Sequence, residues 1–343
     1  MLKAIKLRFT SPVHFGRGRE ELDRSELVYH SDSLKSALYS VGLSVFNEWS
    51  DAGYFFDGFR ISSCFPFAKD EYFLPKPQLR REIELVNFNK DLVSKKVKKI
   101  EYLEKSIFEK FVSDIDKALP IDPEFITSDG LFVCKSRDTF LRKAGNKSIP
   151  VNFYKSEVQQ RVTLPKHGEE EQESKPFYID RINFEENCGL YFLAEFSNPD
   201  LEFQVFTALK LLGEQGIGTD RTVGNGQFEF EPGLDVTDFP IDICKTTGKH
   251  LSLGLFLPSE SDYQNINMKQ SSWNILKRGG YMAGSEFEDF RHLRKKTLFM
   301  FSLGSILHSD HELNGQFVNV APAWNDTRMH PVWRDGKCLL IKI

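Results

Sequence analysis

A glycine-rich stretch constrains this chain more than any other feature. Residues 213–226 read GEQGIGTDRTVGNG and contain five glycines. Glycine adopts positive φ readily and lets a backbone approach a ligand closely, and successive exposed backbone N–H groups form anion-binding concavities. Arg221 adds a charged donor to this stretch, here called the glycine loop. We therefore predict that the loop binds a phosphate backbone. An elaborate helix cap that leads into a strand is the alternative.

The elements around the glycine loop separate it from the phosphate-binding loops of enzymes. A predicted helix over about 200–213, whose apolar residues share one face, precedes the loop, and a predicted strand at 227–231 follows it. The Rossmann fingerprint has the reverse arrangement, because it follows a strand and opens a helix. The loop also lacks the Gly-Lys-Ser/Thr of a P-loop, and Arg221 stands where a kinase loop has its third glycine. The sequence therefore disfavours all three classes of nucleotide site.

The order of the predicted elements indicates the fold class. In the first part of the chain we expect a strand at 2–9, a helix from residue 31, strands at 59–65, 72–74, 177–184 and 189–196, the helix at 200–213 and the strand at 227–231. This order is ferredoxin-like (RRM-like), an antiparallel sheet with helices on one side. A long insertion over about 76–175 interrupts it. There we expect a helix near 97–118, one arm of a hairpin at 151–163 and a mobile loop at 165–176.

The segments after residue 249 alternate in the manner of strands and predict a second domain. Its strand candidates are residues 250–257, 271–276, 296–302, 317–321 and 338–343. The sequence therefore predicts an α+β fold with two ferredoxin-like domains. The first covers residues 1–235 and carries the insertion and the glycine loop. The second covers residues 249–343 and is degenerate.

The charge distribution is typical of a protein that touches RNA on one side only. The net charge is −4, but residues 76–110 carry ten Lys/Arg against six Asp/Glu and residues 135–161 carry seven against two. One basic face on an acidic body suits a subunit that contacts RNA on one side and protein on others.

The five cysteines form no CxxC, which indicates reduced thiols and no zinc ribbon. No apolar run could span a bilayer and no signal peptide is evident, so we expect a cytoplasmic protein.

Four segments in the right order resemble one family. The glycine loop, between the last helix and last strand of a ferredoxin-like domain, resembles the signature of the RAMP superfamily of CRISPR-associated RNA-binding proteins. Three more segments are similar to the N-terminus, the central hairpin and the second domain of the fourth subunit of Csm (type III-A) effector complexes. These segments are LRFTSPVHFGRG with SDSLKSAL, RVTLPKHGEEEQESKPFYIDRINFEENCGLYFL, and SSWNILKRGGYMAGS with TLFMFSLGSIL.

This resemblance implies a role in antiviral defence. The chain would be a non-catalytic subunit of a ribonucleoprotein, without a cofactor, that grips the 5′ handle of the guide RNA. It would contact the large polymerase/nuclease subunit on one side and a backbone subunit on another, and would meet target RNA indirectly. The insertion would supply a thumb hairpin that kinks the guide–target duplex. The equivalent subunit of the Cmr (type III-B) complex is an alternative.

His14 supports a competing hypothesis. Processing nucleases of the RAMP fold use a histidine as general base on a 2′-hydroxyl, and histidine suits proton transfer near neutral pH. His14 lies beside Gly16, Arg17 and Arg19, a plausible phosphate site. This hypothesis predicts an endoribonuclease that processes precursor CRISPR RNA. Such nucleases end soon after the glycine loop, whereas this chain continues, so we favour RNA contact over catalysis at His14.

A second cluster of RNA contacts is expected where two cations stand beside two glycines in KRGGY. Lys277 and Arg278 would reach phosphate, and Tyr281 could stack on a base.

Asp32, at a helix start, is expected to cap that helix. Residues 308–312 (HSDHE) have the residue types of a metal site, but their spacing favours a polar turn. The complete set of predicted RNA-binding residues is His14, Gly16, Arg17, Arg19, Ser31, Lys35, Arg161, Gly216, Gly218, Thr219, Arg221, Gly224, Gly226, Lys277, Arg278 and Gly279.

Overall fold

The structure is a computed structural model, and part of the chain lies outside what it describes. The described residues are 1–16, 22–79, 83–86, 96–113, 117–144, 147–163, 175–243, 248–282 and 284–343. Two of the predicted RNA contacts, Arg17 and Arg19, lie outside these ranges, and so does nearly all of the loop predicted at 165–176.

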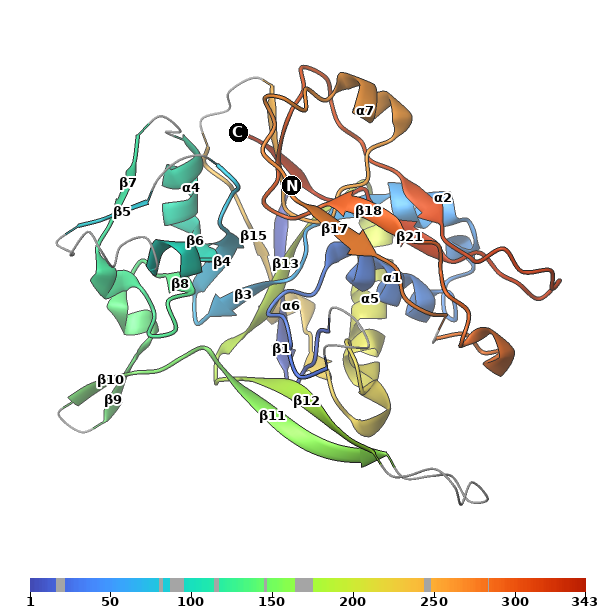
Figure 1. The fold of residues 1–343 in the computed structure, drawn as a ribbon, viewed down its shortest axis with the longest axis horizontal. Helices are drawn as coiled ribbons and strands as arrows, with labels where there is room; N and C mark the ends of the chain where they lie inside the picture. The colour runs from blue at the N-terminus through green and yellow to red at the C-terminus, as the bar shows by residue number, and fades with distance from the viewer. Residues whose placement is uncertain are drawn as a thin grey trace.

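The first part of the chain forms most of the predicted series of strands and helices (Figure 1). The strand predicted at 177–184 instead pairs with the hairpin arm predicted at 151–163, outside the central sheet. Its elements are β1 (Lys3–Phe9), α1 (Ser31–Gly42), α2 (Ala52–Asp57), β2 (Phe59–Ile61), β3 (Phe65–Ala68), β4 (Glu71–Pro75), β13 (Cys188–Phe196), α5 (Pro199–Gln215), β14 (Phe228–Glu229), α6 (Pro232–Asp235) and β15 (Val236–Asp238). The predicted mixed α+β fold is confirmed.

These strands build one continuous sheet together with strands of the insertion. The order is β14–β1–β13–β3–β4–β6–β8, with β15 also paired to β1 and β2 also paired to β13. The pairs of β1 with β13 and of β13 with β3 are antiparallel, whereas β6 and β8 are parallel. β14 therefore lies beside β1, β1 lies beside β13, and β13 lies beside the interrupted strand that β2 and β3 form.

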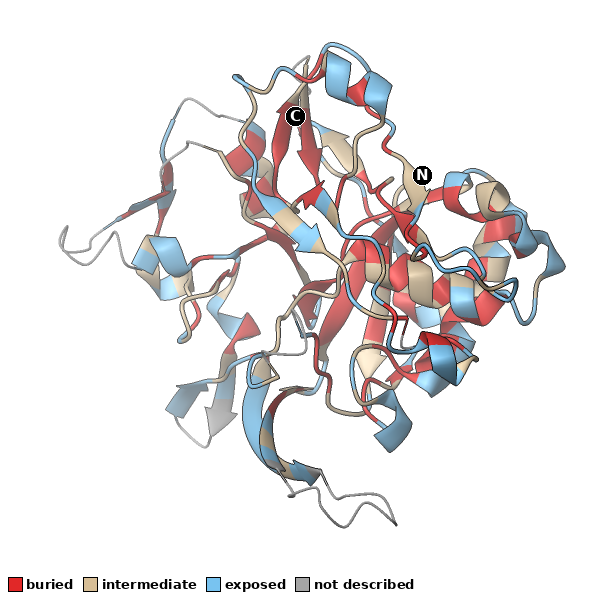
Figure 2. Cartoon of the chain, turned by 45° about the vertical axis from the view of Figure 1, so that its right-hand side comes forward, coloured by how far each residue is buried: buried red, intermediate tan, exposed pale blue. Residues whose placement is uncertain are grey.

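The insertion extends the sheet and then leaves it as a hairpin. Its described elements are β5 (Ile83–Leu85), β6 (Tyr102–Glu104), α4 (Lys105–Ser113), β7 (Leu119–Ile121), β8 (Phe132–Val133), β9 (Leu141–Ala144), β10 (Lys147–Pro150), β11 (Tyr154–Thr163) and β12 (Lys175–Phe184). β11 and β12 pair over ten positions and form a long arm, in which β11 is mostly exposed whereas β12 buries Ile179, Asp180 and Ile182 (Figure 2). The helix predicted near 97–118 is wrong in its extent, because β6 interrupts it and α4 begins only at Lys105.

The remaining elements, from residue 248 onward, are here called the C-terminal part. They are β16 (Lys249–Ser252), α7 (Glu260–Asn265), β17 (Ile275–Arg278), β18 (Leu298–Phe301), β19 (Ile306–His308), β20 (Phe317–Asn319), β21 (Trp333–Asp335) and β22 (Leu340–Lys342). β16 lies between β19 and β22 in a three-stranded sheet. Each predicted strand segment of this part thus overlaps a strand.

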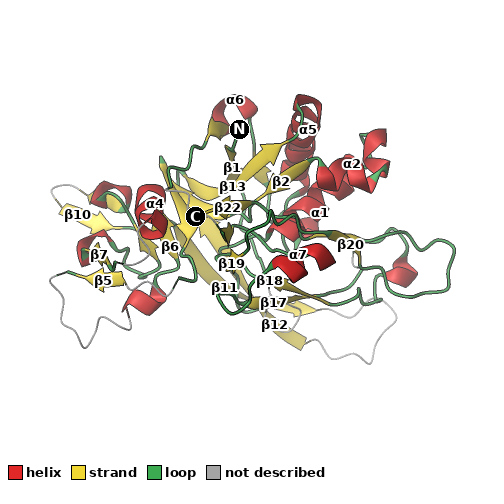
Figure 3. Ribbon diagram, turned by 90° about the horizontal axis from the view of Figure 1, so that it is seen from above, coloured by secondary structure: helices red, strands yellow, loops and turns green. Residues whose placement is uncertain are grey.

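The central sheet is buried on both faces. Alternate residues of β1 point to opposite sides, so Ile5 and Leu7 pack with α1 and α5 whereas Ala4 faces the C-terminal part. Seen from above, α1, α2 and α5 gather on one side of the sheet (Figure 3). Leu251 and Leu339 of the C-terminal part join the core on the other face. The two parts of the chain therefore share one core.

Direct backbone bonds also join the two parts at the break between β2 and β3. The Ser63 N–H donates to the Leu253 carbonyl at 2.9 Å, and the Leu339 N–H donates to the Ile61 carbonyl at 2.9 Å.

None of the helices in the described ranges combines the length and apolar character needed to cross a bilayer.

Helix α1 shows what the sequence pattern predicts and what it misses. The spacing of Leu34, Leu38, Val41 and Val45 predicts one apolar helix face. Leu34, Leu38 and Val41 are buried, whereas Val45 lies beyond the end of the helix and is exposed. The helix ends at Gly42, where a Cβ atom would meet the Trp49 ring at 2.0 Å, so close packing explains this glycine. The expectation that Asp32 caps the helix is wrong, because the N-cap position is His30 and no side chain caps it.

Candidate nucleic-acid interface

The glycine loop is a compact turn closed by its own backbone. α5 ends at Gln215, and the N–H of the following C-cap residue Gly216 donates to the Leu212 carbonyl at 2.8 Å. The Ile217 N–H donates to the Gly226 carbonyl at 2.9 Å. Gly216 and Gly226 have φ of 77° and 76°. A Cβ atom on Gly226 would lie 1.9 Å from the Ile217 carbonyl oxygen, so only glycine fits there.

Most glycine N–H groups of the loop are engaged inside the protein. The N–H of Gly224 donates to the Arg221 carbonyl at 3.0 Å and that of Gly226 to the Pro12 carbonyl at 2.8 Å. Gly216 and Gly226 are also buried, so in this structure the N–H groups of these glycines serve the turn itself. Gly218 differs, because its N–H makes no backbone hydrogen bond within the described ranges. The exposed groups of the loop include the side chains of Thr219 and Arg221.

The glycine loop packs on the segment that follows β1. The Thr219 N–H donates to the His14 carbonyl at 3.0 Å, so the two predicted sites lie side by side. The His14 side chain is only 1% exposed, and its Nδ1 donates to the Asp180 carbonyl at 2.7 Å. Its Nε2 is buried without a hydrogen-bond partner in the described part of the chain. The His14 imidazole therefore lies beneath the surface in this structure, away from any group that binds on the outside of the loop. The neighbouring Gly16 is exposed.

Two arginines of the β11–β12 hairpin lie close to the Asp220 carboxylate of the glycine loop. Asp220, with φ of 63°, accepts a hydrogen bond from Arg161 Nη1 at 2.8 Å, and Arg181 Nη2 lies 3.9 Å from the same oxygen. Arg161 and Asp220 are about one-third and one-quarter exposed. The structure therefore brings the predicted contact Arg161 to the edge of the loop, although Asp220 neutralises it.

Two predicted RNA contacts on α1, Lys35 and Ser31, are buried and bind other parts of the chain. Lys35 is fully buried, and its Nζ donates to the Phe59 carbonyl at 2.8 Å and lies 3.2 Å from Asp335 Oδ2. Ser31 is 1% exposed, and its hydroxyl accepts from the Leu255 N–H at 3.0 Å. Both side chains therefore hold the C-terminal part against α1 and are not exposed to a ligand in this structure.

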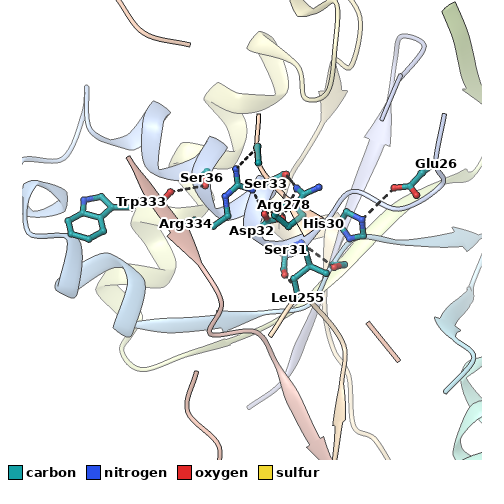
Figure 4. Close-up of polar contacts among 12 residues, drawn as sticks. Glu26, His30, Ser31, Asp32, Ser33, Ser36, Leu255, Arg278, Trp333 and Arg334 are labelled. Atoms are coloured by element: carbon teal, nitrogen blue, oxygen red, sulfur yellow. Dashed lines mark hydrogen bonds and ion pairs between the residues drawn. The ribbon is translucent and has the colours of Figure 1, made fainter. Parts of the chain in front are cut away.

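Asp32 organises two arginines of the C-terminal part. Arg278 donates from Nε and Nη2 to the Asp32 carboxylate at 2.9 Å each, and Arg334 Nη1 donates to the same group (Figure 4). Burial alone would raise the pKa of Asp32, but the charges of Arg278 and Arg334 outweigh it and hold the pKa below its usual value. Arg278 is therefore largely occupied, whereas Lys277 on the same strand is exposed and Gly279 is partly exposed.

A groove of about 410 Å³ separates the glycine loop from the C-terminal part. α1 forms its floor with Ser33, Ser36 and Ser40. The glycine loop contributes Gly218 and Arg221. The opposite wall carries Lys295 and Arg334, with aromatic groups from Tyr281, His330 and Trp333. No carboxylate of the described residues lines this groove, and its charged side chains are cations.

Sequence reasoning missed Lys295 and Arg334, because no local motif surrounds either residue. The predicted stacking residue Tyr281 lines the groove, but its ring is partly covered by the Arg294 guanidinium at 5.3 Å. In the described ranges no cluster of three His, Cys, Asp or Glu residues could hold a metal ion. An anion with a polar backbone and planar groups fits such a groove better than a cation does.

Comparison with known proteins identifies relatives along the chain. Residues 245–343 match the family described as the CRISPR Csm4 C-terminal domain. The curated "CRISPR system Cms protein Csm4" of Methanocaldococcus jannaschii is 23% identical over 376 residues, covering 98% of this chain and 96% of that protein. The protein of the same description from Thermococcus onnurineus is 27% identical over 275 residues, covering 78% and 76%. The chain is a relative of the Csm4 proteins. The resemblance to the fourth subunit of Csm complexes is thus confirmed.

Chains in solved complexes that contain Csm4 have the same fold. A chain in the crystal structure of the Csm3–Csm4 subcomplex in the type III-A CRISPR-Cas interference complex superimposes with a TM-score of 0.63 at 19% identity, covering 100% of this chain and 99% of that chain. A chain in the Csm1–Csm4 cassette in complex with pppApA gives a TM-score of 0.58 at 18% identity, with coverage of 100% and 97%. This chain therefore shares its fold, over its whole length, with one chain of each of these complexes.

Proposed function

We propose that the chain is the Csm4-type subunit of a type III-A CRISPR effector complex and that it holds the 5′ handle of the guide RNA. The groove between the glycine loop and the C-terminal part carries this proposal. It is lined by cations from both walls and by no described carboxylate, which favours a polyanion. Backbone phosphates would lie along the cations, and bases could stack on the aromatic side chains.

The partners follow from the relatives. Solved structures pair Csm4 with Csm3 and with Csm1. We infer that this chain likewise bridges the large subunit and a backbone subunit. The long arm formed by β11 and β12 supports the further inference of a thumb hairpin, because β11 is exposed along most of its length.

The domain division is part of the same proposal. The strand order around β1 and β13, with α1 and α5 on one face, supports a ferredoxin-like domain over residues 1–235. The C-terminal part, residues 249–343, would be its degenerate counterpart with a three-stranded sheet around β16.

We also propose that the subunit positions RNA without cutting it, in the cytoplasm. The burial of His14 argues against the processing-nuclease hypothesis, because a general base must lie within hydrogen-bond reach of the attacked hydroxyl.

Substitution of Arg221 tests the proposal directly. Arg221 is exposed at the groove, whereas Lys269, on the turn after α7, is exposed and contributes nothing to the groove. We expect Arg221→Glu to weaken binding of a handle-bearing guide RNA and Lys269→Glu to leave it nearly unchanged, with the RNA intact in both cases. Binding should be measured at two salt concentrations against a scrambled RNA, because phosphate contacts depend on salt. Equal affinities of the two folded variants would remove the loop from the site. Discrete cleavage abolished by His14→Ala would replace the proposal with the nuclease hypothesis.

A further inference from the structure

Lys295 lies on the wall of the groove opposite the glycine loop. Its backbone is fixed, because its N–H donates to the Gly280 carbonyl at 2.9 Å. Its side chain is partly buried and lines the groove. The ammonium makes no hydrogen bond or ion pair with any residue that the structure describes.

The charged groups around Lys295 come from four elements and are mostly positive. Arg334 of β21 and Arg278 of β17 face it from the C-terminal part, Asp32 faces it from α1, and Arg221 lies across the groove in the glycine loop. Asp32 is already bound by both Arg278 and Arg334. The other titratable groups that line the groove are those of Tyr29, Tyr39, Tyr281 and His330. The cations therefore outnumber the nearby carboxylate.

This surplus of positive charge acts on Lys295 itself. Burial, and then the neighbouring charge of Arg334, lower the pKa of Lys295 to about 8, although Asp32 opposes the shift. An anion bound in the groove would reverse this effect, because it would favour the charged ammonium. The surroundings of Lys295 thus oppose the charge of its ammonium more than they stabilise it.

We propose that Lys295 binds a phosphodiester group of the RNA, so that the strand is held between Lys295 on one wall and Arg221 on the other. This inference rests on the proposed RNA-binding function and adds a contact from the C-terminal part. Because the phosphate favours the charged form of Lys295, RNA binding takes up a proton when the solution is alkaline. Affinity then falls as the pH rises through the pKa of the unbound lysine.

The test compares the full-length wild type with Lys295→Arg and Lys295→Met. Arginine retains its charge at all relevant pH values, whereas methionine has similar length and no charge. The affinity for a handle-bearing guide RNA should be measured by fluorescence anisotropy at about pH 7 and about pH 9, where the wild type should lose up to about tenfold. Lys295→Arg should lose much less between the same two conditions. Lys295→Met should bind more weakly than wild type at the lower pH and show a flat profile.

Two outcomes would overturn different parts of the argument. If Lys295→Arg shows the same pH dependence as wild type, or Lys295→Met binds equally well at the lower pH, Lys295 is not a phosphate contact, while the proposed function stands. If the wild type shows no preference for the handle at either pH, the RNA-binding function itself fails. Thermal melting at both pH values verifies that each variant is folded, and the shared RNA controls for titration of the bases.

Discussion

Lys35 of α1 and Asp335 of β21 form a buried ion pair, with Nζ and Oδ2 3.2 Å apart and side-chain exposures of 0% and 1%. The Lys35 ammonium also donates to the carbonyls of Phe56 and Phe59, so all three of its N–H donors have acceptors. The pair joins the helix that floors the groove to the strand that carries Arg334. The ion pair therefore holds α1 and β21, two elements that line the groove, against each other.

Removal of one partner of this pair should be strongly destabilising. Lys35→Met leaves the Asp335 carboxylate buried without its cation, which typically costs about 3–5 kcal/mol of unfolding free energy. Urea denaturation measures this cost. We expect Lys35→Met with Asp335→Asn to be less destabilised than the sum of the two single variants, because the double variant leaves no unpaired buried charge. Strict additivity would mean that the two groups do not interact.

The sequence predicts local features well, because their signals are local. The glycine loop lies between α5 and β14 as its neighbours indicate, and the buried face of α1 follows from the spacing of Leu34, Leu38 and Val41. Glycine content alone did not show which N–H groups are free, since this depends on the path of the segment after β1.

Long-range pairs explain what the sequence could not predict. Asp32 and Arg334 are 302 residues apart in the chain, and no spacing rule connects them. Lys35 looks like a surface cation until Asp335 is brought beside it by the fold. Lys295 and Arg334 lie in no motif, so their place opposite Arg221 becomes visible only when the C-terminal part packs on α1.

The cluster around Asp32 should make stability depend on pH in the acid range. Its pKa is lower in the folded chain than in the unfolded chain, so its stabilising effect is present above the unfolded value of about 4 and is lost as the pH falls toward the folded value. Asp32→Asn should therefore be less stable than wild type at neutral pH, by at least about 3 kcal/mol. This difference should shrink below about pH 4.

Urea denaturation at neutral and acid pH tests this dependence. Glu312→Gln is the control, because Glu312 pairs with Lys342 at the surface and its loss should cost less than about 1 kcal/mol. A difference between wild type and Asp32→Asn that stays constant with pH would show that the carboxylate charge of Asp32 is not the stabilising factor.

Two glycines of the loop offer a matched comparison of strain and space. Gly224 and Gly226 have φ of 83° and 76°, so alanine is strained at both positions. At Gly224 nothing lies within 4 Å of an added Cβ atom, whereas at Gly226 the Cβ atom would collide with the Ile217 backbone. Gly224→Ala should cost about 1–2 kcal/mol and retain RNA binding. Gly226→Ala should cost clearly more and disrupt the loop. Similar losses of melting temperature and RNA affinity in both variants would contradict this account.

Asp220 should limit the affinity of the glycine loop for RNA. It accepts from Arg161 at 2.8 Å and lies near Arg181, so it neutralises cations at the edge of the loop. Asp220→Asn removes the negative charge and tolerates the left-handed backbone, because asparagine favours this conformation. We expect tighter RNA binding by a few-fold at low salt, and a salt dependence steeper by about one phosphate contact, because Arg161 is released.

Titration of RNA affinity against salt distinguishes the two roles that the Asp220–Arg161 pair could have. Glu260→Gln removes one exposed carboxylate from α7, outside the groove, and controls for the change in net charge. If Asp220→Asn binds RNA more weakly than Glu260→Gln does, the carboxylate positions Arg161 for a phosphate. If it binds more tightly, the carboxylate competes with phosphate for Arg161, and RNA must displace this ion pair when it enters the groove.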